Sequence, residues 1–284
     1  MGNILTLSGK KQSGKNTSAN WLLGLTMCEL GIVRDYIHIT NKGQLQITDL
    51  WGDESFRGIF DYFNPHPSMA DFLEEHIHPW FKIYSFADIL KRDVCMGLLG
   101  LSEKQCFGTD EDKNSLTELK WEDMPGIITP EVFGPVAAQY NESMDDFQKY
   151  WNIIVREPGP MTAREVLQFV GTEVFRKMYK NIWVRGTIDR ILKENTGLAV
   201  IVDGRFPNEV SITQEAGGKV VRFLRHKIEP DDHESETALD PENFDQSKFD
   251  VIIENGDMKI GEQNKVLYEH LVTWNYVSEM QSEE

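Results

Sequence analysis

The stretch NILTLSGKKQSGK, residues 3–15, decides the fold of this chain. Residues 3–8 are apolar and β-favouring, and an amphipathic helix is predicted over roughly residues 16–30. Between them, residues 9–15 match GxxxxGK, the pattern of a phosphate-binding loop. Glycines let consecutive backbone N–H groups turn toward phosphate oxygens, and the helix N-terminus adds a partial positive charge. The alternative is a strand-to-helix turn that binds no ligand.

The residues of this loop predict an ATP site. Lys15 would reach the β- and γ-phosphates and neutralise charge during phosphoryl transfer. Asn16 stands where Ser or Thr normally binds magnesium, and its amide oxygen can ligate Mg²⁺ directly or through water. Thr17 is expected to hydrogen-bond the α-phosphate. The predicted ATP-binding residues of the loop are Gly9, Lys11, Gln12, Ser13, Gly14, Lys15, Asn16 and Thr17.

Strands and helices alternate along the rest of the chain. Further strands are predicted at 82–86, 198–203, 219–225 and 249–255, and helices at 87–100, 162–179, 181–195, 207–216 and from about 260. This alternation predicts an α/β fold, a three-layer sandwich around a central, mostly parallel sheet. We expect a single domain, 1–284, with three subregions. They are a β-hairpin and loops at 33–80 with a turn at 41–43, an irregular and helical substrate-side insert at 102–160, and a lid-like acidic loop at 226–247.

The charge of the chain limits its partners. Lysine plus arginine is 29 and aspartate plus glutamate is 46, which gives a net charge of −17. That balance argues against sequence-independent binding of a nucleic-acid polymer. A local cluster of cations can still bind a small anion. We expect most carboxylates of the DDHESE run, 231–236, to be solvated. No apolar run approaches a membrane span and no secretion signal is visible, so a cytoplasmic protein is predicted.

A second anchor is predicted where the apolar strand LAVIVD ends. Asp203 lies at the carboxyl end of that strand, where ligands of open α/β sheets bind. With Asn16 it is the predicted magnesium ligand, and Arg205 could face the same phosphates. The alternative is that Asp203 caps the helix beginning near Pro207 and that Arg205 pairs with Glu209.

Several segments together resemble the deoxynucleoside monophosphate kinases of tailed bacteriophages. They are SGKKQSGKNT, SFADILK, TAREVLQFVGTEVFR, VDGRFPNE, GGKVVRFLR, DHESE and DVIIENG, and they occur in the family's order. Asp or Asn commonly follows GK in that family, so Asn16 fits its pattern. The resemblance implies a P-loop nucleotide kinase that moves the γ-phosphoryl group of ATP onto a deoxynucleoside monophosphate with the help of Mg²⁺.

The resemblance also implies a monophosphate site. A nucleotide kinase aligns two anionic ligands and spreads cations over the transferring group, so it needs arginines and lysines that converge, and aromatic and amide groups for the base. The substrate-binding candidates are Phe86, Lys91, Arg164, Gln168, Gly171, Thr172, Arg176 and Trp183. Arg225 joins the ATP-binding set, and the candidate catalytic residues are Lys15, Asp203, Arg205 and Arg164.

Each of these residues also has a structural interpretation. Arg164 and Arg176 could be solvated helix residues paired with glutamates, Trp183 could belong to the core, and Lys91 and Gln168 could lie on the surface. Two other functions stay open: a P-loop kinase of another phosphorylated metabolite such as phosphomevalonate, and a nucleotide-binding regulatory protein without turnover. The bases accepted and the oligomeric state also stay open, and the aromatic residues of 33–80 are compatible with a homodimer.

Overall fold

The computed structural model describes residues 2–33, 38–47, 58–60, 62, 67–140, 154–225 and 234–279. The chain divides into two units, one made of Met1–Phe86 with Val184–Glu284 and the other of Ala87–Trp183. Among the described residues, no helix is both long enough and apolar enough to cross a membrane.

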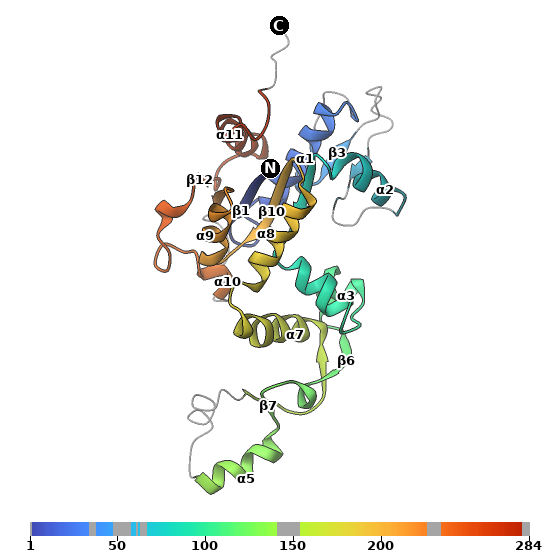
Figure 1. Cartoon of the computed structure of the whole chain (residues 1–284), viewed down its shortest axis with the longest axis vertical. Helices are drawn as coiled ribbons and strands as arrows, with labels where there is room; N and C mark the ends of the chain where they lie inside the picture. The colour runs from blue at the N-terminus through green and yellow to red at the C-terminus, as the bar shows by residue number, and fades with distance from the viewer. Residues whose placement is uncertain are drawn as a thin grey trace. The chain divides into compact units, whose positions relative to one another are not determined.

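A five-stranded parallel sheet is the centre of the first unit (Figure 1). Its strands are β1 (Asn3–Ser8), β5 (Phe81–Tyr84), β10 (Leu198–Gly204), β11 (Lys219–Leu224) and β12 (Val251–Glu254), in the spatial order β12-β11-β1-β10-β5. The first strand of the chain therefore lies in the middle, with later strands on both sides. Ligands of such open sheets bind beyond the carboxyl ends of the strands. The predicted α/β class with a mostly parallel sheet is confirmed.

Alternating side chains of the strands build one apolar layer on each face of this sheet. Leu5 and Leu7 pack in one core with helices α1 (Lys15–Glu29) and α11 (Ile260–Thr273). Ile4 packs in another with α8 (Ile182–Glu194) and α9 (Pro207–Glu215). This follows from the two-residue period of a strand. Each fully buried leucine contributes about 2 kcal/mol to the stability of this arrangement, and the result is the predicted three-layer sandwich.

The insert at 33–80 contains the predicted hairpin and a helix that we did not predict. Strands β2 (His38–Ile39) and β3 (Leu45–Ile47) pair antiparallel around the expected turn, and β4 (Gly58–Phe60) pairs with β3. The loops predicted after them were partly wrong, because α2 (Pro67–Phe72) continues into a π-helical segment, η2 (Leu73–Ile77). Leu73 and Ile77 are buried in the main core, and this packing stabilises the helix despite the neighbouring prolines.

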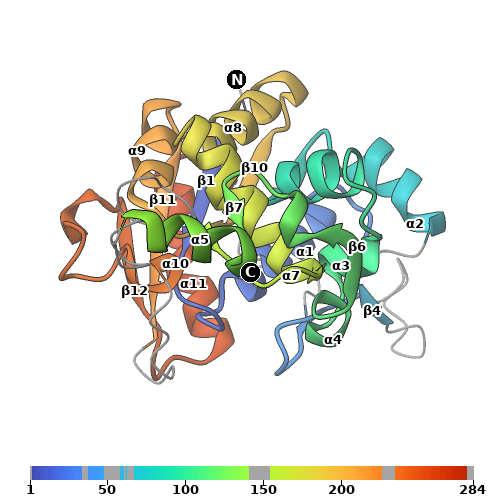
Figure 2. The same cartoon turned by 90° about the horizontal axis from the view of Figure 1, so that it is seen from below.

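The second unit is built on two helices that widen along their length. The predicted helix at 87–100 is largely the π-helical η3 (Ile89–Met96), and the one at 162–179 is α7 (Ala163–Gln168) followed by the π-helical η5 (Phe169–Arg176). Helices α3 (Glu103–Phe107) and α4 (Asp110–Lys113) pack against α7 (Figure 2). The remaining elements are β6 (Leu116–Lys120), the 3₁₀ segment η4 (Trp121–Asp123), β7 (Ile127–Ile128), α5 (Pro130–Tyr140), β8 (Ile154–Val155) and β9 (Pro160–Thr162).

Candidate phosphate-binding site

The loop between β1 and α1 requires glycine at both ends of its motif. Gly9 has a φ of 153°, and a Cβ there would lie 2.9 Å from the carbonyl oxygen of Phe223. Gly14 has a φ of 98°, and a Cβ there would lie 2.7 Å from Oε1 of Gln263. Both positions combine a backbone conformation that favours glycine with a close approach. The GxxxxG spacing is therefore set by this loop's own geometry.

Lys15, the last residue of the motif, turns back into the loop. Its Nζ donates to the carbonyl oxygens of Gly9 and Lys10, both at 2.6 Å, and to Ser13 Oγ at 3.3 Å. Burial, followed by the positive charges of Arg205 and Arg222, lowers the pKa of Lys15 to about 7. The first unit thus concentrates positive charge where β1 ends.

Asp203, near the end of β10, lies beside the end of β5. Its Oδ2 accepts a hydrogen bond from Ser85 Oγ at 2.5 Å, and its Oδ1 accepts one from the backbone N–H of Phe86 at 2.8 Å. These bonds fix the carboxylate at the carboxyl edge of the sheet, and its charge acts on Lys15. Because β5 and β10 are neighbouring parallel strands, their ends meet as the strand pattern predicts.

Arg205 forms an ion pair with Glu236, whereas the alternative drawn from the sequence paired it with Glu209. Its guanidinium forms an ion pair with Glu236, whose other oxygen accepts from the backbone N–H of Lys11 at 2.9 Å. Glu209 instead accepts from the backbone N–H groups of Arg205, at 2.7 Å, and Phe206, at 3.0 Å. The N-terminus of α9 is therefore capped by Glu209, which contacts Arg205 through the backbone N–H of that residue.

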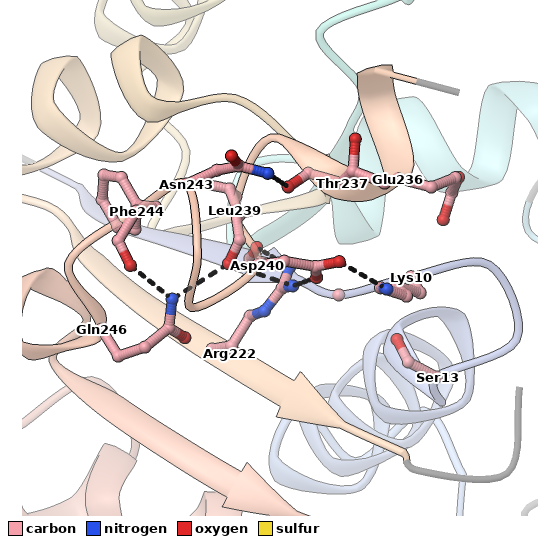
Figure 3. Close-up of polar contacts among 12 residues, drawn as sticks. Lys10, Ser13, Arg222, Glu236, Thr237, Leu239, Asp240, Asn243, Phe244 and Gln246 are labelled. Carbon is pink, nitrogen blue, oxygen red and sulfur yellow. Dashed lines mark hydrogen bonds and ion pairs between the residues drawn. The ribbon is translucent and has the colours of Figure 1, made fainter. Parts of the chain in front are cut away.

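A second acidic contact reaches the same loop from the segment after α10 (Glu234–Thr237). Asp240 accepts from Lys10 Nζ at 2.7 Å and lies 3.5 Å from NH2 of Arg222, which is buried on β11 (Figure 3). Arg222 also donates to Ser8 Oγ at 3.2 Å. Glu236 is only 8% exposed and is an exception to the expectation that most carboxylates of the 231–236 run are solvated. The ion pair with Arg205 and the hydrogen bond from the Lys11 N–H hold its carboxylate at the loop.

A buried amide network, which the sequence did not reveal, supports the loop. Asn255 Nδ2 donates to the carbonyl oxygen of Ser13 at 2.7 Å and to Gln263 Oε1. Gln263 Nε2 donates to the carbonyl oxygen of Gly14 at 3.3 Å and to Ser18 Oγ at 2.7 Å. These side chains come from the C-terminal part of the chain, some 240 positions from the loop. The polar pair Gln263-Asn264 within an otherwise amphipathic helix was the available signal.

The other predicted ATP-side residues lie around this loop. Gln12 has a φ of 63°, and its carbonyl oxygen accepts from Arg225 NH1 at 3.2 Å. Ser13 is buried, Asn16 is exposed and Thr17 is half-buried at the first turns of α1. Phe86 is also in the first unit and is buried against the sheet with Tyr84. Residues 226–233 of the predicted lid-like acidic loop lie outside the described residues.

The second unit carries the remaining substrate-side candidates. Arg164, Gln168, Thr172 and Arg176 recur every four residues from α7 into η5. Four residues overshoot one α-helical turn of 3.6 residues and fall short of one wider π-helical turn, so the row stays on one face. Gln168 and Thr172 are exposed. Thr162 begins this helix through a capping box with Glu165, which explains the TARE motif.

The structural interpretations of some candidates are also visible. Arg164 NH2 forms an ion pair with Asp110 Oδ1 at 2.6 Å, and Lys91 Nζ lies 4.8 Å from the ring centre of Phe107. Trp183 is 5% exposed, and its Nε1 donates to the carbonyl oxygen of Gly171 at 3.1 Å. The indole therefore packs in the core of this unit and holds the backbone at Gly171. A role for any of them in substrate binding stays a prediction.

Asp203 and Asn16 are the predicted magnesium ligands. Within the described parts of the chain, no group of three or more His, Cys, Asp or Glu side chains could hold a metal ion. Mg²⁺ in kinase sites is held by one or two carboxylates together with substrate phosphates, so such a group is not required. The carboxylate of Asp203 and the exposed amide of Asn16 supply the hard oxygen donors that this ion prefers.

Comparison with known proteins identifies the family of the chain. Residues 108–264, more than half of the chain, match the family model of deoxynucleotide monophosphate kinase. The matched range contains Arg164, Asp203 and Asn255. A protein of Acanthamoeba polyphaga mimivirus, provisionally assigned as a deoxynucleotide monophosphate kinase, is 30% identical over 171 residues, covering 55% of this chain and 67% of the viral protein. The chain belongs to the deoxynucleotide monophosphate kinase family.

Proposed function

We propose that this kinase uses ATP and Mg²⁺ to convert a deoxynucleoside monophosphate into its diphosphate. The observation that carries the proposal is the Gly9–Lys15 loop at the end of the central strand, where the charges of Asp203 and Arg205 act on Lys15. In a chain of this family, the arrangement supports a bound triphosphate as the phosphoryl donor. ADP is then the second product.

The reaction needs positioned charge and no general base. An oxygen of the acceptor's phosphate attacks the γ-phosphorus, and the bond from that phosphorus to the β–γ bridging oxygen breaks. Because the acceptor is already an anion, no proton has to be removed. Lys15 and Arg205 then stabilise the charge that spreads over the transferring group. Arg225 and the loop's backbone N–H groups orient the triphosphate.

Asp203 and Asn16 are the residues that would hold the metal ion. When bound, Mg²⁺ neutralises charge on the phosphates of ATP. The hydrogen bonds from Ser85 and Phe86 keep the Asp203 carboxylate at the edge of the sheet, and each of its oxygens retains a lone pair for ligation. This side chain therefore reaches the site already oriented.

The acceptor side is assigned to the second unit. The row of Arg164, Gln168, Thr172 and Arg176 offers two cations and two hydrogen-bonding groups along one helix face, which suits a phosphate and the polar edge of a base. Lys91 and Gly171 complete the proposed set in this unit, with Trp183 supporting its wall. Phe86 belongs to the first unit and is buried there, so its contact with the base stays a prediction. Both substrates are small solutes, so we place the reaction in the cytoplasm, or in the host cytoplasm if the chain is viral.

A substrate panel tests the proposal. The protein is mixed with ATP, Mg²⁺ and each of the four deoxynucleoside monophosphates, and the nucleotides are separated by anion exchange. We expect equal amounts of ADP and deoxynucleoside diphosphate with at least one of the four. If none is converted while phosphomevalonate or another phosphorylated metabolite is, the substrate class is wrong. Nucleotide binding without any product would instead indicate a regulatory protein.

A further inference from the structure

The carboxylate of Glu236 uses the two kinds of donor that a phosphate-binding loop offers its ligand. One oxygen accepts from the backbone N–H of Lys11 inside the loop, at 2.9 Å, and the other forms an ion pair with Arg205. A backbone N–H and a cation are also the partners of a phosphate oxygen in such loops. Glu236 is buried although it is an ionisable residue, so its carboxylate is held at the loop rather than in solvent.

We infer that Glu236 is an internal competitor for the phosphate-binding loop, and that a nucleotide must displace its carboxylate to bind. The inference rests on the proposed nucleotide site and adds how that site is regulated. A phosphate group and the carboxylate cannot both accept from the Lys11 N–H and pair with Arg205. Two anions brought together in a partly buried site would also repel each other strongly.

Asp240 anchors the segment that follows Glu236, so the Glu236 carboxylate can leave the loop while this segment stays bound to the first unit. Asp240 pairs with Arg222, which is 3% exposed on β11, and with the flexible side chain of Lys10. Figure 3 shows these contacts to one side of the short helix that carries Glu236. Further bonds, from Gln246 Nε2 to the carbonyl oxygens of Leu239 and Phe244, tie the following turn together. Among the residues that the structure describes here, displacement can therefore be confined to the short helix before Asp240.

Competition of this kind weakens nucleotide binding. The apparent affinity equals the intrinsic affinity multiplied by the fraction of molecules in which Glu236 does not occupy the loop. Substitution of Glu236 by Gln removes the charge but keeps the size of the side chain. We expect Glu236→Gln to tighten binding of a non-hydrolysable ATP analogue about tenfold. Glu236→Asp, which keeps the charge on a shorter side chain, should tighten it less.

The control is Glu242→Gln, which removes the same charge from an exposed position six residues away. Its nucleotide affinity should stay close to that of the unmodified protein. Binding is measured by titration calorimetry with ATP analogue, ADP and inorganic pyrophosphate, and thermal unfolding is measured for every variant. Because these are binding measurements, they test the inference even if no deoxynucleoside monophosphate is phosphorylated. Such a lack of turnover would contradict only the proposed function.

The unmodified protein supplies an independent measurement if a variant fails to fold. Hydrogen exchange of a peptide that contains residues 234–240 should become faster when the ATP analogue binds. Slower or unchanged exchange would contradict displacement. The inference is also wrong if Glu236→Gln binds the analogue no more tightly than Glu242→Gln does. Loss of kcat with unchanged binding would show instead that Glu236 positions Arg205.

Discussion

The Nζ atom of Lys15 lies 2.6 Å from the carbonyl oxygen of Gly9, so the last residue of the phosphate-binding motif closes back on the first. This contact buries the amine, and burial is the main reason why the pKa of Lys15 falls to about 7. Arg205 and Arg222 lower that pKa in the same direction. The charge of Lys15, which we propose binds the phosphates of ATP, therefore depends on pH near neutrality.

Nucleotide binding should take up protons above pH 7. At pH 8 the Lys15 amine of the free protein is mostly neutral, because its pKa is about 7. A bound polyphosphate stabilises the ammonium and raises that pKa, so binding at pH 8 should take up close to one proton. At pH 6 the amine is already charged and uptake by Lys15 should nearly vanish. Calorimetry in two buffers that differ in ionisation enthalpy measures the uptake.

Lys15→Arg is the matched control for that experiment. A guanidinium stays charged at both pH values, so the variant should lose the additional uptake seen at pH 8. An unmodified protein that takes up no more protons at pH 8 than Lys15→Arg would show that Lys15 does not titrate in the site.

Asp203→Asn should slow turnover far more than it weakens ATP binding. The amide keeps an oxygen to accept from the backbone N–H of Phe86, so the local fold is retained. The lost charge would reduce kcat on the order of 10²-fold, comparable with the loss of one stabilising electrostatic contact in a transition state. Asp189→Asn, on the exposed surface of α8, is the control. An unchanged rate would remove Asp203 from the site.

Arg164→Ala should weaken the monophosphate and leave ATP binding unaltered. The arginine's ion pair with Asp110 is exposed, so its loss should cost little stability. We expect the KM for the deoxynucleoside monophosphate to rise about tenfold or more, as for the loss of a charged phosphate contact. Arg185→Ala, which removes an exposed arginine of α8, should change neither KM. If only the KM for ATP rises, the two substrates have been assigned to the wrong sides.

Asn255→Asp should reduce ATP affinity without changing the KM for the monophosphate. A carboxylate cannot donate to the carbonyl oxygen of Ser13 or to Gln263, so the loop loses its support from β12. One lost buried hydrogen bond corresponds to about a tenfold change in binding. Tyr276→Phe removes a hydrogen bond to Ile4, at the other end of β1, and should leave both KM values unchanged. Equal effects of the two variants would indicate a general loss of stability.

The sequence was most informative where a local rule sets the structure. The strand, loop and helix around Gly9–Lys15 were predicted to within a residue or two, because glycine geometry and strand periodicity are local. The same holds for the strand that ends near Asp203. The wider turns of η3 and η5 were not predicted, because apolar spacing defines a buried helix face but not whether its backbone widens.

Long-range polar contacts were beyond reach. Glu236 bonds to a residue 225 positions away, and Asn255 to one 242 positions away. Most carboxylates of the 231–236 run were therefore predicted to be solvated. The net charge of −17 gives no information on which carboxylates lie against the loop. No pattern in residues 229–245 singles out Glu236, since its burial and partners are decided by how β11 and the loop fold.

Transfer of labelled phosphate tests the central claim most directly. ATP labelled in its γ-phosphate is mixed with Mg²⁺, a deoxynucleoside monophosphate and either the unmodified protein, Lys15→Met or the control Lys42→Ala. The account predicts that the unmodified protein and Lys42→Ala move the label into a deoxynucleoside diphosphate, and that Lys15→Met does so at least 10²-fold more slowly, on the order expected for a lost transition-state contact. Label that stays in ATP or appears only as free phosphate with all four monophosphates would contradict it.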